Sequence, residues 1–344
     1  MAASGNAYAC SIGPYTADSD PRKGDRLLLS LVVERGMDAP GRCIIELADP
    51  LHAPVEAGAA VTIALDTGNG SVTVFTGEAY ATAVTPTGQL VRAVDALAKL
   101  ASTRVEAAYE EVTSDFIAKD LIDKSGASAG TIAAGPSLGA YVVHRGPRAL
   151  HHLGVLAALG GADVWTDGKG KVQLGVPKSG GADHRFKLGE TILALDLRAE
   201  SPAVDGIEVW GEGAAGAKGA DAAHWLTTDL SGVTGKAAVD EKGKAQPDKA
   251  GKHVIRHADG ALRAGEAASK VAKAWAESQG ARRLRGRIEV AGAPEVEPGD
   301  LIGLDGLPQD HCAAKMLSGG GVVRVRGVRH VLDRARGLRT MLEV

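Results

Sequence analysis

Aromatic side chains are scarce in this sequence, with 12 among 344 residues, whereas glycine occurs 46 times. Hydrophobic residues still make up 44% and charged residues 24%, a composition typical of folded globular chains. With so few aromatic rings, the cores must be built from Val, Leu, Ile and Ala. Such cores suit sheets and barrels better than aromatic-lined ligand pockets. The length leaves room for two or three domains.

Cysteine is also rare. Cys10, Cys43 and Cys312 are odd in number and form no CxxC motif, which argues against a disulfide framework or a cysteine-based zinc site. We therefore expect lone buried thiols. The 39 basic and 42 acidic residues nearly cancel, so the chain as a whole lacks the basic excess of a nucleic-acid-binding protein.

No segment has the features of a signal peptide or a membrane span. The first 21 residues contain no Lys or Arg and no continuous apolar run. The longest uncharged stretch, Ser125–His144, is interrupted by glycines and Pro136. We expect a soluble protein that is made in the cytoplasm without a signal peptide and has no membrane partner.

The first third of the chain is predicted to be β. Residues 1–24 are expected to form a polar N-terminal arm, and residues 25–106 a first tube-like β-barrel. The Asn-Gly pair within Thr67–Gly70 lies between alternating segments, which is typical of a type I′ hairpin turn because both central residues need positive φ. The expected strands are Arg26–Glu34, Arg42–Ala48, Ala60–Asp66, Ser71–Thr76, Ala79–Val84 and Leu90–Val94.

Residues 107–185 are predicted to form an α/β insertion domain. Thr113 is suited to cap a helix that Gly126 ends, and Pro147 fits the first turn of a second helix that stops at Gly160. Strands are expected at Ala140–Val143, Asp163–Thr166 and Lys171–Leu174.

Residues 186–344 are predicted to form a second tube-like β-barrel. We expect a long loop at 211–253, which is rich in Gly, Ala and Lys and has little apolar periodicity. A helix is expected at 260–279, with Asp259 as its cap and small apolar residues on one face. Strands are expected at Thr191–Ala199 and Gly206–Trp210.

Two distant stretches share one order of features. Ile45–Ala48 matches Ile288–Ala291, and a Val-Glu-X-Gly turn, an apolar strand ending in aspartate, a glycine-containing strand and a closing strand follow in both. The residue offset is nearly constant (243 for Ile45 and Ile288, 241 for Gly58 and Gly299, 250 for Gly77 and Gly327). This favours one β module present twice, although any two β units share turn glycines and alternation. A trimer would then present six similar barrels.

Several stretches carry a further likeness. They are Asp38–Gly41 with Cys43–Leu47, Thr113–Gly126, Tyr141–Leu174, and Glu297–Leu301 with Gly321–Val344. In these stretches the chain resembles the hub proteins of contractile phage tails and related injection systems, the late control protein D family. The motifs are loose and contain no catalytic signature, but together they span most of the chain from residue 25 onward.

The resemblance implies a mainly β protein with an α/β insertion and two similar antiparallel tube-like β-barrels. It implies a baseplate hub without enzymatic activity: a homotrimer with pseudo-sixfold symmetry that joins the hexameric inner tube to the trimeric spike. The implied partners are further copies of the chain, the inner tube protein, a spike protein and other baseplate proteins of a phage tail or injection particle. Because many relatives fuse the spike to the hub and this sequence ends at Val344, we expect a separate spike protein.

An alternative function, a nucleotide-binding enzyme, would use Gly211–Gly216, which has the formal pattern GxGxxG. That fingerprint requires a following helix and a second parallel strand, and no amphipathic run follows here. His144, His151 and His152 are close in sequence but lack HxxxH or HExxH spacing, so we expect ordinary surface or packed histidines. No G-x-S-x-G elbow supports a serine nucleophile, and the acidic pair Glu110–Glu111 is expected on a solvated strand end. We therefore predict no catalytic, cofactor-binding or metal-binding residues.

The C-terminal segment is dense in arginine, with Asp333 as its single acid between residues 322 and 339. Arg324 and Arg326 are two apart and share a strand face. Two interpretations stay open: a solvated barrel face, or arginines that pair with acids of a neighbouring subunit or line a channel. A nucleic-acid-binding barrel would instead show salt-sensitive DNA retention through Arg324 and Arg326, which the near-neutral net charge disfavours. The arginines are Arg324, Arg326, Arg329, Arg334, Arg336 and Arg339.

Overall fold

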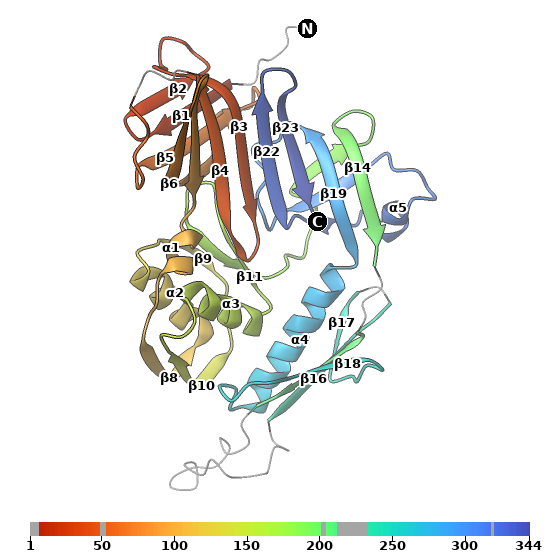
Figure 1. The fold of residues 1–344 in the computed structure, drawn as a ribbon. Coiled ribbons are helices and arrows are strands. Elements are labelled where there is room, and N and C mark those ends of the chain that lie inside the picture. Colours follow the sequence, from red (N-terminus) through yellow and green to blue (C-terminus); the bar gives the residue numbers. More distant parts are fainter. Residues whose placement is uncertain (1–6, 49–52, 201–203, 212–232, 242, 318–319) are drawn as a thin grey trace.

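The computed structural model describes residues 7–48, 53–200, 204–211, 233–241, 243–317 and 320–344. A single sheet of 11 strands dominates it and draws on both ends of the chain (Figure 1). The strand order is β14-β19-β23-β22-β3-β4-β7-β6-β5-β1-β2. The expectation of a mainly β fold with large antiparallel sheets is confirmed.

The first β module consists of antiparallel neighbours, as the alternating sequence predicted. Two expected strands, Ser71–Thr76 and Ala79–Val84, are one long strand, β6, whose first half pairs with β5 and whose second half pairs with β7. The module contains β3 (Leu27–Gly36), β4 (Ala39–Ala48), β5 (Ala60–Asp66), β6 (Val72–Thr85) and β7 (Gly88–Val94).

The expected polar arm is wrong for residues 7–18, which form a hairpin of β1 (Ala7–Ile12) and β2 (Tyr15–Asp18). Strand β1 pairs with β5 and buries Cys10 and Ile12 in the core of the first module. The alternation is weak because small residues fill the remaining positions, so only pairing with β5 reveals the strand.

The hairpin between β5 and β6 is present, but its turn is not the expected type I′. Positive φ occurs at Gly68 (102°) and Gly70 (109°) and not at Asn69. The Asp66 carboxylate accepts backbone N–H bonds from Gly68 at 2.7 Å and Gly70 at 3.1 Å. This Asx-type interaction organises a wider loop than the two-residue turn.

The second β module is built from strands late in the chain. Strand β19 pairs with β14 and β23, and β23 pairs with β22. The short strand β21 precedes β22 and pairs with β20, which also pairs with β13. Its elements are β13 (His184–Lys187), β14 (Ile192–Ala199), β19 (Leu284–Ala291), β20 (Leu301–Asp305), α5 (Cys312–Met316), β21 (Val323–Arg324), β22 (Gly327–Asp333) and β23 (Gly337–Glu343).

The two modules share one topology. The neighbours β3-β4-β7-β6 correspond to β14-β19-β23-β22, while β5 beside the first half of β6 corresponds to β20 beside β21. The match of Ile45 with Ile288 is consistent with this correspondence. The sequence match of Gly77 with Gly327 is off by three residues. Gly77 lies opposite Val61, and the counterpart of Val61 is Leu301, which lies opposite Arg324. The structural counterpart of Gly77 is therefore Arg324.

One antiparallel joint connects the modules into a continuous sheet. Strand β22 pairs with β3 over seven residues, from Gly327 opposite Gly36 to Asp333 opposite Ser30. These strands lie side by side in the middle of the sheet although about 300 residues separate them (Figure 1). Chain segments far apart in the sequence thus meet as ladder partners.

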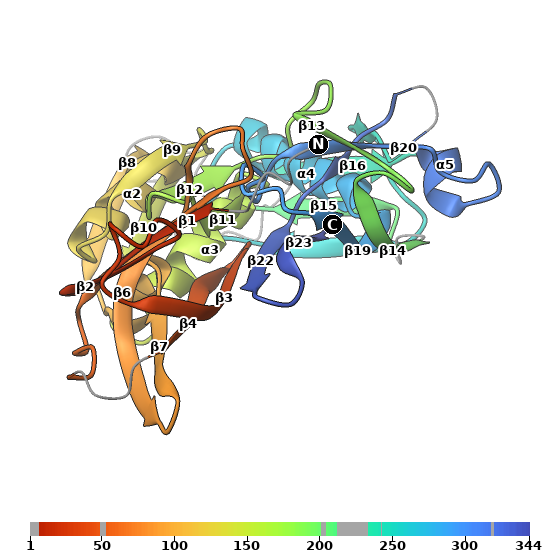
Figure 2. The ribbon, with the colours of Figure 1, turned by 90° about the horizontal axis from the view of Figure 1, so that it is seen from above.

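Two insertions pack together at one end of the sheet strands and share a hydrophobic core (Figures 1 and 2). Trp275 of α4 donates its indole N–H to the Ala158 carbonyl of α3 at 2.6 Å, which connects the two insertions directly. The first insertion contains α1 (Leu97–Ser102), β8 (Ala107–Thr113), α2 (Ser114–Lys124), β9 (Ala129–Ile132), β10 (Ser137–Val143), α3 (Ala149–Leu159), β11 (Asp163–Thr166) and β12 (Val172–Gly175). The second contains β15 (Gly206–Trp210), β16 (Thr234–Val239), β17 (Ala245–Pro247), β18 (Val254–Ala258) and α4 (Gly265–Ala281).

The expected loop at 211–253 is wrong in part. Residues 212–232 lie outside the described residues, but β16 and β17 form a four-stranded sheet with β15 and β18. Their small residues give little periodicity, and the strands exist because β15 and α4 cover them. Helix α4 begins at Gly265 instead of 260, and Asp259 does not cap it, because its carboxylate accepts the Ala261 N–H at 2.9 Å.

Candidate assembly interface

The large sheet has one fully buried face that continues across the joint between the modules. One row of directly opposed residues runs through six strands, and every member is at most 1% exposed. The row passes from apolar residues to a polar pair, His330 and Thr340, and back to apolar residues. It consists of Val290, Thr340, His330, Val33, Cys43 and Ala93.

His330 is the unusual member of this row. Its Nδ1 lies 3.0 Å from the Thr340 hydroxyl, while its Nε2 has no hydrogen-bond partner among the described residues. Burial, with a smaller effect from Arg35, lowers the pKa of His330 to about 3. The ring is therefore neutral at pH 7.

The opposite face of the sheet carries charges that pair across strands. Arg42 contacts Glu34 at 2.9 Å, and Arg329 from the second module contacts the same carboxylate at 3.3 Å. Arg339 contacts Glu289 at 2.7 Å and Asp333 at 3.5 Å. This free face carries side chains of both signs in both modules, and the pair of Arg329 with Glu34 crosses the module joint.

The predicted placement of Arg324 and Arg326 is wrong, because neither lies on a solvated face nor points away from its own chain. Both pair with Asp163 of the first insertion: Arg324 at 2.5 Å and Arg326 at 3.0 Å, with Arg282 at 3.4 Å. We call these four residues the junction cluster. The side chains of Asp163 and Arg324 are only 4% and 5% exposed.

The junction cluster holds its central carboxylate in the charged form. Burial acts to raise the pKa of Asp163, but Arg326 and Arg324 outweigh it and lower the pKa below its ordinary value. A second group lies beside it, where buried Arg35 donates to the Thr166 carbonyl and contacts Glu297, both at 3.3 Å. Charges thus fasten the insertion to both β modules.

The histidines noted in the sequence, His144, His151 and His152, lie together with their rings in edge contact around His152. His152 is buried, and its Nδ1 lies 3.3 Å from the Tyr141 hydroxyl and its Nε2 3.3 Å from the His144 carbonyl. Burial lowers the pKa of His152, which fits a packed neutral ring. Within the described ranges, no group of three or more His, Cys, Asp or Glu side chains could hold a metal ion.

Apart from Gly211, the glycine-rich stretch Gly211–Gly216 lies outside the described residues. The cysteines are unpaired thiols, and both Cys10 and Cys43 are buried. In the part of the chain that the structure describes, no helix has the length and apolar character needed to cross a membrane.

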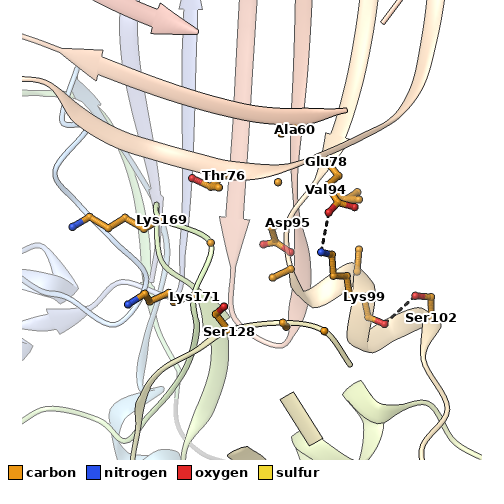
Figure 3. Close-up of a pocket in the computed structure, with 16 residues that line it drawn as sticks. Ala60, Thr76, Glu78, Val94, Asp95, Lys99, Ser102, Ser128, Lys169 and Lys171 are labelled. Atoms are coloured by element: carbon orange, nitrogen blue, oxygen red, sulfur yellow. Dashed lines mark hydrogen bonds and ion pairs between the residues drawn. The ribbon is translucent and has the colours of Figure 1, made fainter. Parts of the chain in front are cut away.

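A cavity of about 520 Å³ lies between the first β module and the first insertion (Figure 3). Its two carboxylates are both engaged: Glu78 pairs with Lys99 at 2.8 Å, and Asp95 accepts N–H bonds from Gly41 and Leu97 and the hydroxyl of Thr166. Lys169 and Lys171 extend away from Lys99 in this view. The bond between Asp95 and Thr166 connects the first module to the first insertion.

Eight neighbouring strands of the large sheet, from β14 to β6, have no further strand partner at either end in the described part of the chain except β5, although helix α5 packs against β14. Among the described residues, no strand pairs with the outer side of β14, nor with β6 beyond its contact with β5. Apolar side chains are exposed on both, with Val84 56%, Tyr80 52% and Leu193 55% exposed. Open edges with exposed apolar residues are ready for pairing with another chain.

Comparison with known proteins identifies the fold. No family model and no curated protein matches the sequence. A 43 kDa tail protein of prophage MuSo2 from Shewanella oneidensis matches with TM-score 0.67 and 14% identity over 98% of both chains. A tail protein from Neisseria meningitidis MC58 matches with TM-score 0.66 and 13% identity over 98% of this chain and 96% of that one.

A third structure broadens the likeness. The E. coli c3393 protein, described as a type VI secretion system component similar to the T4 tail proteins gp27 and gp5, matches with TM-score 0.54 and 14% identity. The alignment covers 94% of this chain and 74% of that one. The chain therefore has the fold of phage tail proteins, which confirms at the level of fold the likeness found in the sequence.

Proposed function

We propose that this chain is a structural baseplate hub of a contractile tail or injection system. In this proposal three copies form a ring with pseudo-sixfold symmetry, which joins a hexameric inner tube to a trimeric spike. The observation that carries it is the repeated topology, β3-β4-β7-β6 and β14-β19-β23-β22, within one continuous sheet. Two similar modules per chain give a trimer six similar units.

The fold likeness supports a structural role. Two of the similar structures are tail proteins, and the third is described as a secretion-system component resembling phage tail proteins. In this proposal the chain binds partners and catalyses nothing. The expected partners are the inner tube, the spike and other baseplate proteins of the assembled particle.

The free face of the sheet is the natural wall of the channel in such a ring. Its paired charges, Arg42 with Glu34 and Arg339 with Glu289, leave no strong field of one sign. A wall of this kind would neither retain a polyanion nor repel a passing protein. The junction cluster and the two insertions would lie on the outside of the wall.

The proposal is tested by co-expressing the chain with tube and spike proteins encoded beside it. We expect native mass spectrometry to show a trimer bound to the spike, and electron micrographs to show sixfold features on the tube side and threefold features on the spike side. A monomer that captures neither protein would overturn the proposal. Nucleotide binding at micromolar affinity, lost on Gly213→Val, would favour the enzyme instead.

A further inference from the structure

Helix α3 differs from the two other long helices in its outward side. The outward side of α2 carries an ion pair of Lys119 with Asp115. The outward side of α4 carries a similar pair of Lys273 with Glu277. Helix α3 contains no charged residue. Because a helix that is apolar on every side is normally buried on every side, the outward side of α3 lacks the cover that its composition predicts.

A groove runs along this outward side of α3. It has a volume of about 560 Å³ and lies between α3, α1 and the turn that joins β3 to β4. Helices α1 and α3 pack against each other at this place (Figure 1). Its floor spans eight positions of α3, about 12 Å, which matches two turns of a second helix. The floor consists of Leu150, Gly154, Val155 and Ala158.

The chain itself does not require the glycine in the middle of this floor. Gly154 lies inside a helix, where glycine is less favourable than alanine. Its φ is not positive. Beyond its chain neighbours and the backbone of its own helix, a Cβ at Gly154 would meet no atom within 4 Å. The missing side chain does leave room for the backbone of another chain to approach closely.

The charges at the two ends of the groove oppose the dipole of α3. Arg148 is the N-cap of α3, beside the positive end of that dipole. Its guanidinium donates to the Ser102 carbonyl at 2.8 Å, and no carboxylate pairs with it among the described residues. Asp38 accepts the Val164 N–H at 3.1 Å, shortly after the negative end of α3. The Asp38 side chain stays 53% exposed, with Arg326 3.9 Å away, so both charges have the sign that is unfavourable for α3.

We infer that this groove binds an amphipathic helix of a partner protein, antiparallel to α3. An antiparallel helix places its negative C-terminal end at Arg148 and its positive N-terminal end at Asp38, so both charges become favourable. Its apolar side would cover the floor, with a close approach of the two axes at Gly154. An extended strand carries only a small net dipole and does not fit the charged ends. This inference goes beyond the proposed hub and does not depend on a ring.

Peptide binding to the full chain tests the inference. The probe is a set of fluorescent, overlapping 20-residue peptides that covers the proteins encoded beside this chain. We expect a peptide with apolar residues at i, i+3, i+4 and i+7 to bind and to become helical, as measured by anisotropy and circular dichroism. Absence of any binding peptide, or a bound peptide that stays extended, would overturn the inference. Self-association of the chain that is lost in Gly154→Leu would place a second copy in the groove and also overturn it.

Filling the groove gives the largest expected change in affinity. Gly154→Leu adds a side chain to space that is open in the free chain, so we expect the fold to be retained and the affinity for the peptide to fall by about tenfold or more. Lys119→Leu is the matched control, because it adds the same side chain to the outward side of α2. Binding that survives Gly154→Leu, or that falls equally in both variants, contradicts the proposed site.

The charged ends test the orientation of the bound helix. Arg148→Gln keeps a donor for the Ser102 carbonyl, and Asp38→Asn keeps an acceptor for the Val164 N–H, while each removes one charge. We expect each variant to weaken peptide binding by roughly two- to fivefold, and salt to reduce the difference. Arg145→Gln, outside the groove lining, is the control and should bind normally. Unchanged or tighter binding by both variants would overturn the antiparallel orientation.

A smaller substitution separates binding from folding. Gly154→Ala places a better helix former in open space, so we expect the unfolding temperature of the free chain to rise by about 2 °C. The affinity for the peptide should fall, because the added methyl group lies where the partner helix approaches. A lower unfolding temperature would show that the fold itself requires the glycine and would overturn the inference.

Discussion

The two β modules have the same strand order but are elaborated at different places. In the first module β3 and β4 meet in a tight turn, where Asp38 adopts φ 64°. In the second, the equivalent strands β14 and β19 are separated by the whole insertion from β15 to α4. Because the insertion leaves from a hairpin end, the ladder between β14 and β19 keeps its register.

The modules also differ in what they bury. The second module places His330 and Thr340 in the continuous core row, where the first has Val84 and Gln89. His330 is covered by β3, while Val84 stays exposed at an open edge. The same strand is therefore paired within the chain in the second module and has no strand partner on that side in the first module.

The largest effect should come from breaking the junction cluster, which fastens the first insertion to the second module. Asp163→Ala leaves Arg324, Arg326 and Arg282 without their shared carboxylate, and we expect a loss of about 3–5 kcal/mol in the free energy of unfolding. Denaturant titration measures it. The control is Glu106→Ala, whose partner Arg145 is exposed, and it should change stability by less than about 0.5 kcal/mol. Equal effects would show that the cluster does not hold the insertion.

The buried histidine should make the second module sensitive to acid. The pKa of His330 is about 3 in the folded chain, because of burial, and about 6.5 when unfolded. Between these values only the unfolded state binds the proton, so stability falls as pH decreases, by about 1.4 kcal/mol per unit. Because the slope reaches its full value only below the unfolded pKa, the loss from pH 6.5 to 4.5 amounts to roughly 2 kcal/mol.

The variant His330→Val copies the residue of the first module and should remove this part of the pH dependence. Unfolding free energies measured from pH 7 to 4.5 test the expectation. The exposed His151, changed to Gln, is the control and should leave the slope unchanged. If His330→Val unfolds as steeply with acid as the unaltered chain, His330 does not titrate as proposed.

A smaller effect is expected at Thr340, the partner of His330. Its hydroxyl lies 3.0 Å from His330 Nδ1 and accepts the Ala293 N–H at 3.0 Å. Thr340→Val keeps the volume but leaves those groups unsatisfied, which should cost about 1–3 kcal/mol. Thr340→Ser retains the hydroxyl and should recover part of that loss in the same unfolding assay. A fully stable Thr340→Val variant would contradict the expected role of these bonds.

The smallest effects should appear on the free face, and they should differ between the modules. Arg339 is 24% exposed and contacts two carboxylates, whereas Arg42 is 67% exposed and contacts one. We expect Arg339→Ala to cost up to about 1 kcal/mol and Arg42→Ala less than about 0.5 kcal/mol, with both effects reduced by salt. If Arg42→Ala lost more stability than Arg339→Ala, the exposure of the arginine would not determine how much each ion pair stabilises the chain.

Local signals in the sequence predicted many elements well. The strand Ala60–Asp66 has its expected bounds, and α2 begins after Thr113 as expected. Strands β16 and β17 were missed because their small residues carry no period, and they form only against β15 and α4. The arginine density near the C-terminus was visible, but its partner Asp163 gave no signal because about 160 residues separate it from Arg324.

By itself, the sequence determined the β character and the repeated module. These properties depend on residue alternation, turn residues and residue types, which act over a few neighbours. Only the tertiary structure decided that β22 pairs with β3, that the arginines turn inward to Asp163, and which strand edges stay open. Strand pairing and buried charge pairs depend on residues far apart in the chain, so no local pattern specifies them.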